Sequence, residues 1–129
     1  YGCGSGILAI AAMKLGAAAA IAVDVDPLAL EAARYNASRN AVRLDVRDGQ
    51  QDIPESARIT VANILANPLR MLAPLLASRT QRGGSIALSG ILEEQAGAVI
   101  AAYAPWARLA LAAREAGWVL LAGERSGTA

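Results

Sequence analysis

The sequence predicts an α/β protein with a doubly wound, mostly parallel sheet and a C-terminal antiparallel hairpin. Three observations support this class. The chain opens on a glycine-rich turn that runs directly into a helical pattern, and strand-like and helix-like segments then alternate. Near the end, a glycine turn separates two strand-like segments, as in a hairpin. We interpret residues 1–129 as a single domain built on one core.

The individual elements follow from local signals. Asp26-Pro27 and Asn67-Pro68 each place a capping side chain before a proline, which is typical of a helix start. Gly16 ends the first helical pattern, and Gly83-Gly84 turns the chain into a strand. The expected helices are 5–15, 27–39, 67–79 and 93–103, and the expected strands are 20–24, 42–46, 59–63, 85–89, 108–113 and 118–122.

The opening turn carries glycines at alternate positions: Gly2, Gly4 and Gly6. Such a loop lets backbone amides approach a ligand, and the helix that follows adds its unpaired N–H groups. A dinucleotide fingerprint would need glycine where Ile7 stands, and a P-loop would need Lys-Ser or Lys-Thr after the last glycine, whereas the sole lysine is Lys14. Neither nicotinamide chemistry nor nucleotide hydrolysis is therefore expected. The alternative is an ordinary tight strand-to-helix turn.

Asp24 is the second landmark, because it ends a short buried strand about twenty residues after the loop. A carboxylate there can accept hydrogen bonds from both hydroxyls of a ribose. Asp26 is better explained as the cap of the next helix. A carboxylate at a strand end is by itself usually a solvated turn residue, but its distance from the glycine loop favours the ligand interpretation.

Asp48 and Asn63 also follow strand-like segments, so we expect them at the same edge of the sheet as Asp24. Ligands of open α/β sheets bind outside the carboxyl ends of the strands. The amide of Asn63 offers one acceptor oxygen and two donor hydrogens beside a ligand. The alternative is that Asn63 only caps or turns the backbone.

Composition excludes several classes of function. The chain has no histidine, and Cys3 is its sole cysteine, so we expect no histidine-based triad, disulfide or metal site. The net charge of +1 provides no basic face for direct nucleic-acid binding. Lys14 and Gly16 interrupt the apolar stretch 7–23, which argues against a membrane span. With no signal peptide recognised either, we expect a cytoplasmic protein.

Four blocks of the sequence resemble the catalytic domain of the bacterial methyltransferases that modify ribosomal large-subunit protein L-eleven, the PrmA family. The first two blocks are shared with many S-adenosylmethionine enzymes, whereas the last two are more particular to this family. The resemblance extends to Trp118. The blocks are YGCGSGILAIAA at 1–12, VDVDP at 23–27, ANILANPL at 62–69 and LSGIL at 88–92.

The resemblance implies a Rossmann-like class I fold with S-adenosylmethionine as cofactor. It also implies methyl transfer to amino groups, on lysine side chains and the N-terminus, of a ribosomal large-subunit protein, without metal, membrane or direct nucleic-acid partners. Asn63 would lie beside both the cofactor and the incoming amine. In the cofactor site, Gly2, Gly4 and Gly6 would line the methionine and ribose, Asp24 would hold the ribose, and Asp48 would approach the adenine, although the chain is short around 43–55.

The chain departs from the family pattern at its start. In the family a hydrophobic strand ending in an acidic residue precedes Gly2, and a separate N-terminal domain recognises the ribosomal protein. We therefore expect an N-terminally truncated methyltransferase domain whose first central strand is missing. One alternative is a non-catalytic fragment that keeps the outline of the fold. Another is a methyltransferase that acts on a different amine.

Overall fold

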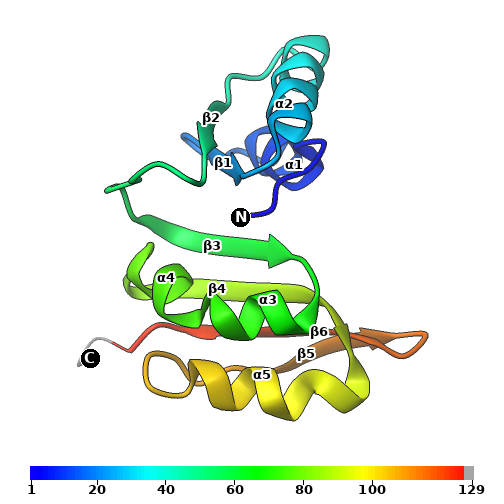
Figure 1. The fold of residues 1–129 in the computed structure, drawn as a ribbon, viewed down its shortest axis with the longest axis vertical. Helices are drawn as coiled ribbons and strands as arrows, with labels where there is room; N and C mark the ends of the chain where they lie inside the picture. The colour runs from blue at the N-terminus through cyan, green and yellow to red at the C-terminus, as the bar shows by residue number, and fades with distance from the viewer. Residues whose placement is uncertain (127–129) are drawn as a thin grey trace. The chain divides into compact units, whose positions relative to one another are not determined.

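The computed structural model describes residues 1–126 and forms two compact units, Tyr1–Ile53 and Pro54–Ala129 (Figure 1). Each unit contains its own parallel strand pair and its own helices. Because each unit is compact by itself, the elements are described unit by unit.

The first unit contains a two-stranded parallel sheet and two helices. Asp26 caps the longer helix by accepting a hydrogen bond from the backbone N–H of Leu28 at 3.0 Å, and Pro27 occupies the first turn. The buried residues come mainly from one strand and one helix: Ala22, Val23, Leu30, Ala33, Ala37 and Ile53. The elements are α1 (Ile7–Lys14), β1 (Ile21–Asp24), α2 (Pro27–Arg39) and β2 (Asp45–Asp48).

Helix α1 differs from α2 in that none of its residues is buried, although its sequence is almost wholly apolar. Ile7 is 69% exposed. In contrast, α2 buries Leu30, Ala33 and Ala37. Within this unit, α2 therefore packs one apolar face against its neighbours, whereas α1 buries none of its residues.

The second unit is a four-stranded mixed sheet with the strand order β3-β4-β6-β5. The β3–β4 pair is parallel, and β6 pairs antiparallel with both β4 and β5, so the last strand lies between two earlier ones (Figure 1). The strands are β3 (Ala57–Asn63), β4 (Thr80–Leu92), β5 (Ala110–Glu115) and β6 (Trp118–Glu124). The helices are α3 (Ala66–Met71), α4 (Ala73–Ser78), the short 3-10 helix η1 (Glu93–Gln95) and α5 (Ala96–Tyr103).

One face of this sheet is buried beneath α3, α4 and α5. Along β3, Thr60 and Ala62 are buried, whereas Ile59 and Val61 between them are exposed, as the period of two of a strand requires. The buried Tyr103 hydroxyl donates a hydrogen bond to the backbone oxygen of Leu69 at 2.7 Å, which ties α5 to α3. The fully buried side chains include Leu69, Leu76, Ile86, Leu88, Ile91, Val99, Tyr103 and Leu121.

The structure confirms the α/β class and the C-terminal hairpin, and it corrects several element boundaries. The strand expected over 108–113 lies at Ala110–Glu115, and Asn67, expected to cap a helix, lies inside α3, whose N-cap residue is Leu65. The helix expected over 67–79 is two helices, because Pro74 has no N–H to continue the hydrogen-bond ladder across Leu72. The strand expected over 42–46 lies at Asp45–Asp48, and the strand expected over 85–89 extends over Thr80–Leu92.

Four of the described strands lie at edges of their sheets. β1 and β2 pair only with each other, β3 pairs only with β4, and β5 pairs only with β6, so each has one edge that no strand of its own sheet covers. In residues 1–126, none of the helices is long and apolar enough to cross a membrane.

Candidate functional site

The glycine loop of the first unit needs its glycines for conformational reasons. Gly2, Gly4 and Gly6 have φ values of 65°, 53° and 84°, in the left-handed region that side chains disfavour. The N–H of Cys3 donates to the backbone oxygen of Val23 at 2.9 Å, which places the loop alongside β1. The predicted loop is therefore formed, and it is attached to the strand that carries Asp24.

The Asp24 carboxylate is held by the backbone on both sides. One oxygen accepts a hydrogen bond from the N–H of Gly4 at 3.0 Å, and the other accepts one from the N–H of Asp26 at 3.0 Å. Partial burial would raise the pKa of Asp24, but the hydrogen bonds from Asp26, Gly4 and Val25 outweigh it and lower the pKa below its usual value. Each carboxylate oxygen keeps a further lone pair for a ligand hydroxyl.

The loop leaves room for a ligand at one glycine and packs tightly at another. A Cβ atom built on Gly4 would meet no heavy atom within 4 Å, whereas one on Gly6 would lie 3.2 Å from the Cβ of Ala33 in α2. Gly6 thus seats the loop on the helix, and Gly4 leaves open space next to Asp24.

Asp48 lies at the same edge as Asp24, because the two residues are paired in the β1–β2 register. Its Oδ1 accepts a hydrogen bond from the backbone N–H of Gln50 at 2.9 Å, and the N–H of Gly49 donates to the Asp24 backbone oxygen at 2.9 Å. The side chain of Asp48 therefore organises the turn after β2. The first unit brings together five of the six predicted residues: Gly2, Gly4, Gly6, Asp24 and Asp48.

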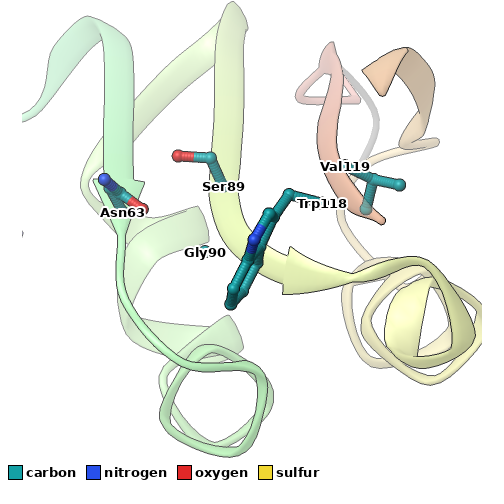
Figure 2. A pocket seen from close by; sticks show the side chains of 5 residues that line it. All are labelled: Asn63, Ser89, Gly90, Trp118 and Val119. Atoms are coloured by element: carbon teal, nitrogen blue, oxygen red, sulfur yellow. The ribbon is translucent and has the colours of Figure 1, made fainter. Parts of the chain in front are cut away.

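Asn63, the sixth predicted residue, lines a pocket in the second unit (Figure 2). It ends β3 and is the register partner of Ser89 on β4, while β6 contributes Trp118 and Val119. Three strands thus place an amide, a hydroxyl and an indole around one shallow space.

Gly90 allows the two strands of this pocket to approach closely. Its φ is 84°, and a Cβ atom built on it would lie 2.5 Å from the backbone oxygen of Ile64 and 2.9 Å from Oδ1 of Asn63. Since real Cβ atoms do not come so near, only glycine fits here without moving the Asn63 side chain.

The sequence interpretation gave no role to Ser89, Gly90, Trp118 or Val119, although LSGIL was one of the blocks behind the resemblance. For Ser89 and Gly90, the available local signal was a polar residue followed by a glycine near the end of a strand. Nothing local indicated Trp118, because its place beside Asn63 depends on β6 pairing with β4.

The fold is the Rossmann-like fold of the class I methyltransferases. A solved RNA methyltransferase from Salinibacter ruber, determined in complex with S-adenosyl-L-homocysteine, shares the fold with a TM-score of 0.75 at 20% identity, over 99% of this chain and 79% of that one. A solved ribosomal protein L11 methylase from Lactobacillus delbrueckii subsp. bulgaricus is more similar, with a TM-score of 0.87 and 36% identity over 97% of this chain and 67% of that one.

The chain belongs to the ribosomal protein L11 methyltransferase (PrmA) family, whose pattern matches residues 1–126. It is 51% identical over 125 residues to the ribosomal protein L11 methyltransferase of Cupriavidus pinatubonensis and 52% identical over 123 residues to that of Dechloromonas aromatica. These matches cover 97% and 95% of this chain, and 42% of each relative. The chain therefore spans less than half the length of these curated relatives.

Proposed function

We propose that this chain forms the catalytic part of a protein N-methyltransferase that transfers methyl groups from S-adenosylmethionine to amino groups of a ribosomal large-subunit protein. The acceptors would be lysine side chains and the N-terminal amine, and the reaction would take place in the cytoplasm without a metal. The family membership supports the substrate class. The single observation that carries the chemistry is the neutral pocket containing Asn63 at the carboxyl end of β3.

The residues of the first unit fit the proposed cofactor. Open space beside Gly4 admits a ligand next to the backbone, and the Asp24 carboxylate, held ionised by two backbone N–H groups, offers lone pairs to a ribose diol. Asp48, at the paired strand end, would approach the adenine. When bound, S-adenosylmethionine supplies an electrophilic methyl carbon on a positively charged sulfur.

The role proposed for Asn63 is to orient the acceptor amine. Its amide oxygen would accept a hydrogen bond from the amine N–H and so aim the nitrogen lone pair, and catalysis would then consist mainly of positioning. A free lysine amine has a pKa of about 10.4, so the attacking neutral form is rare at neutral pH. Partial desolvation in a pocket without acidic groups lowers that pKa and enriches the neutral amine without a histidine base.

Replacing Asn63 with alanine tests this role. We expect turnover on a purified ribosomal large-subunit protein to fall by about 100-fold, the scale of one lost positioning hydrogen bond at a reacting centre. Affinity for S-adenosylmethionine, measured by calorimetry, should stay within about threefold, since Asn63 acts on the amine. Asn40→Ala is the matched control, because it removes an amide at the end of α2 that donates a hydrogen bond to the Asn36 backbone oxygen at 2.8 Å.

The outcomes distinguish the possible roles. Loss of turnover with retained cofactor affinity supports amine positioning. Equal loss of both would make Asn63 a cofactor ligand only, and unchanged turnover would refute its catalytic role.

A second candidate function, a non-catalytic polypeptide that keeps the fold, is favoured by one observation. β1 and β3 are both edge strands of their sheets, and an uncovered strand edge leaves backbone groups without ladder partners. Calorimetric titration of S-adenosylmethionine into this chain, and into a longer form extended at its N-terminus, separates the candidates. Binding by both forms supports the enzyme, binding by the longer form alone supports the non-catalytic interpretation of this chain, and binding by neither overturns the cofactor assignment.

A further inference from the structure

Trp118 places a large aromatic surface in the same pocket as Asn63. It is the first residue of β6, the register partner of Leu92, and it is 49% exposed. Figure 2 shows the indole standing across the pocket from Asn63, beside Ser89 and Gly90, with the ring seen nearly edge-on. One ring face is thus turned toward the space that Asn63 borders.

The lining of the pocket is electrically neutral. Its five residues include an amide, a hydroxyl and an indole but no carboxylate. Outside the lining, Arg114 of β5 pairs with Glu93 at 2.8 Å, and Glu115, the register partner of Trp118 on β5, is an exposed carboxylate that would add to the attraction for a cation. A cation entering the pocket would therefore be attracted by the π face of Trp118 and by the oxygens of Asn63 and Ser89.

The proposed reaction creates a cation at this place. As the nitrogen–carbon bond forms and the carbon–sulfur bond breaks, the positive charge passes from sulfur to nitrogen, and the proton lost from the incoming ammonium goes to water. An aromatic face attracts an alkylammonium through its quadrupole, most strongly for indole. An interaction that strengthens as charge develops on nitrogen lowers the barrier and raises kcat.

We propose that the indole face of Trp118 receives the aliphatic acceptor amine and stabilises the positive charge that develops on its nitrogen as the methyl group is transferred. The inference rests on the proposed function, because it takes the Asn63 pocket as the amine site. The ligands are primary aliphatic amines and the N-methylated ammonium products that the reaction forms from them. Trp118 is thereby a determinant of specificity for aliphatic amines.

The first experiment compares two substitutions that keep or remove the π face. Trp118→Leu should lower kcat on the ribosomal protein by about 2- to 30-fold, the range of one cation–π contact. Trp118→Phe should recover part of this loss, since phenylalanine keeps a weaker π face. The control is Leu111→Ala, which changes an exposed residue of the neighbouring strand β5. It tests whether any substitution in this sheet lowers kcat.

The second experiment measures cation selectivity without turnover. Choline, a trimethylammonium cation, and its uncharged carbon isostere 3,3-dimethylbutan-1-ol are each titrated into the protein while the indole N–H signals are followed by NMR. Trp118 is identified with a Trp106→Phe variant, since the chain has two tryptophans. We expect choline to shift the Trp118 signal several-fold more strongly than 3,3-dimethylbutan-1-ol does, whereas the Trp106 signal, which serves as the internal reference, should respond equally to both.

The outcomes separate this inference from the proposed function. Methyl transfer by the wild type with equal kcat in Trp118→Leu, or equal losses in the Leu and Phe variants, would overturn the role of Trp118. Equal responses to the cation and the alcohol would overturn it as well. Absence of methyl transfer by the wild type, with cation selectivity retained, would overturn the proposed function and leave the alkylammonium site supported.

Discussion

The two units hold their site residues by different physical means. In the first, hydrogen bonds from backbone N–H groups fix the Asp24 carboxylate at 3.0 Å on either side. In the second, the chain at Gly90 approaches Asn63 so closely that a Cβ atom on Gly90 would lie 2.9 Å from the Asn63 Oδ1 atom. Electrostatic interactions thus hold the site residue of the first unit, and steric contact restricts the site residue of the second.

This difference determines what each site tolerates. A hydrogen-bonded carboxylate responds to changes of charge and pH, because its partners favour the ionised form. A sterically confined amide responds to added volume, because packed backbone cannot yield by several tenths of an ångström at little cost. Substitutions that alter only one of the two sites should therefore have distinguishable effects, the largest at Gly90.

Gly90→Ala tests the steric construction. The new methyl would overlap the Ile64 backbone oxygen, and alanine would have to adopt φ 84°. We expect the free energy of unfolding to fall by about 3 kcal/mol or more, from strain of about 1–3 kcal/mol together with a similar cost of overpacking. Urea denaturation measures it.

Gly83→Ala is the matched control for Gly90→Ala. Gly83 lies in the same strand with φ 79°, but a Cβ atom there would meet nothing within 4 Å. The free energy of unfolding of Gly83→Ala should fall by only about 1–2 kcal/mol, the cost of backbone strain alone. Equal losses at the two positions would show that the approach of β3 and β4 does not depend on Gly90.

Asp24→Asn tests the electrostatic construction. The substituted amide keeps the shape, but its NH₂ group would face a backbone N–H of Gly4 or Asp26, and the negative charge is lost. We expect the Kd for S-adenosylmethionine to rise by about 10- to 100-fold, which corresponds to about 1.5–3 kcal/mol for hydrogen bonds to a charged group. Calorimetry measures this change.

Asp48→Asn is the comparison for Asp24→Asn, because it alters the neighbouring strand end in the same way. The Asp48 carboxylate accepts a hydrogen bond from the Gln50 N–H in the turn. We therefore expect the Kd for S-adenosylmethionine to rise by less than about tenfold. A larger effect at Asp48 than at Asp24 would reverse the assignment of the ribose ligand.

The pH dependence of stability gives the smallest predicted effect. Because the folded state lowers the pKa of Asp24, this group stabilises the fold above its unfolded pKa of about 3.9, and the contribution is lost as pH falls through the lower folded value. The difference in unfolding free energy between the wild type and Asp24→Asn should therefore shrink between roughly pH 5 and pH 3. The pKa of Asp45, lowered mainly by its hydrogen bond to Arg47, changes equally in both proteins and cancels. A constant difference across this range would contradict the prediction.

The fold class could be predicted because its signals are local. Asp26-Pro27 marked the start of α2 correctly, and the Gly117 turn marked the hairpin. The boundaries that differed involve competition between local and non-local effects. Pro74 divides the helix expected over 67–79. β4 extends beyond residue 89 because Ile91 and Leu92 pair with β6, and it begins before residue 85 because Thr80 pairs with Ala57 of β3.

In the candidate site too, the residues with a local sequence signal could be predicted and the others could not. Gly2, Gly4, Gly6 and Asp24 lie in a loop and strand end that are recognisable from spacing, and the structure joins them through the Gly4–Asp24 hydrogen bond. The neighbours of Asn63 were not recognisable, since Ser89 reaches it through a parallel register and Trp118 through an antiparallel one. The functions of all these residues stay predictions until the substitutions above are measured.

The position of β6 has a consequence for how the polypeptide is made. β5 is synthesised before β6, yet β6 is its only partner strand in the described sheet, and all residues of β5 are exposed. While the ribosome is still adding residues 118–124, β5 has nothing to pair with, and β4 presents an open edge. β5 and the β6-facing edge of β4 can therefore complete their backbone pairing only after residues 118–124 have been made, and until then both are uncovered strand edges in the nascent chain.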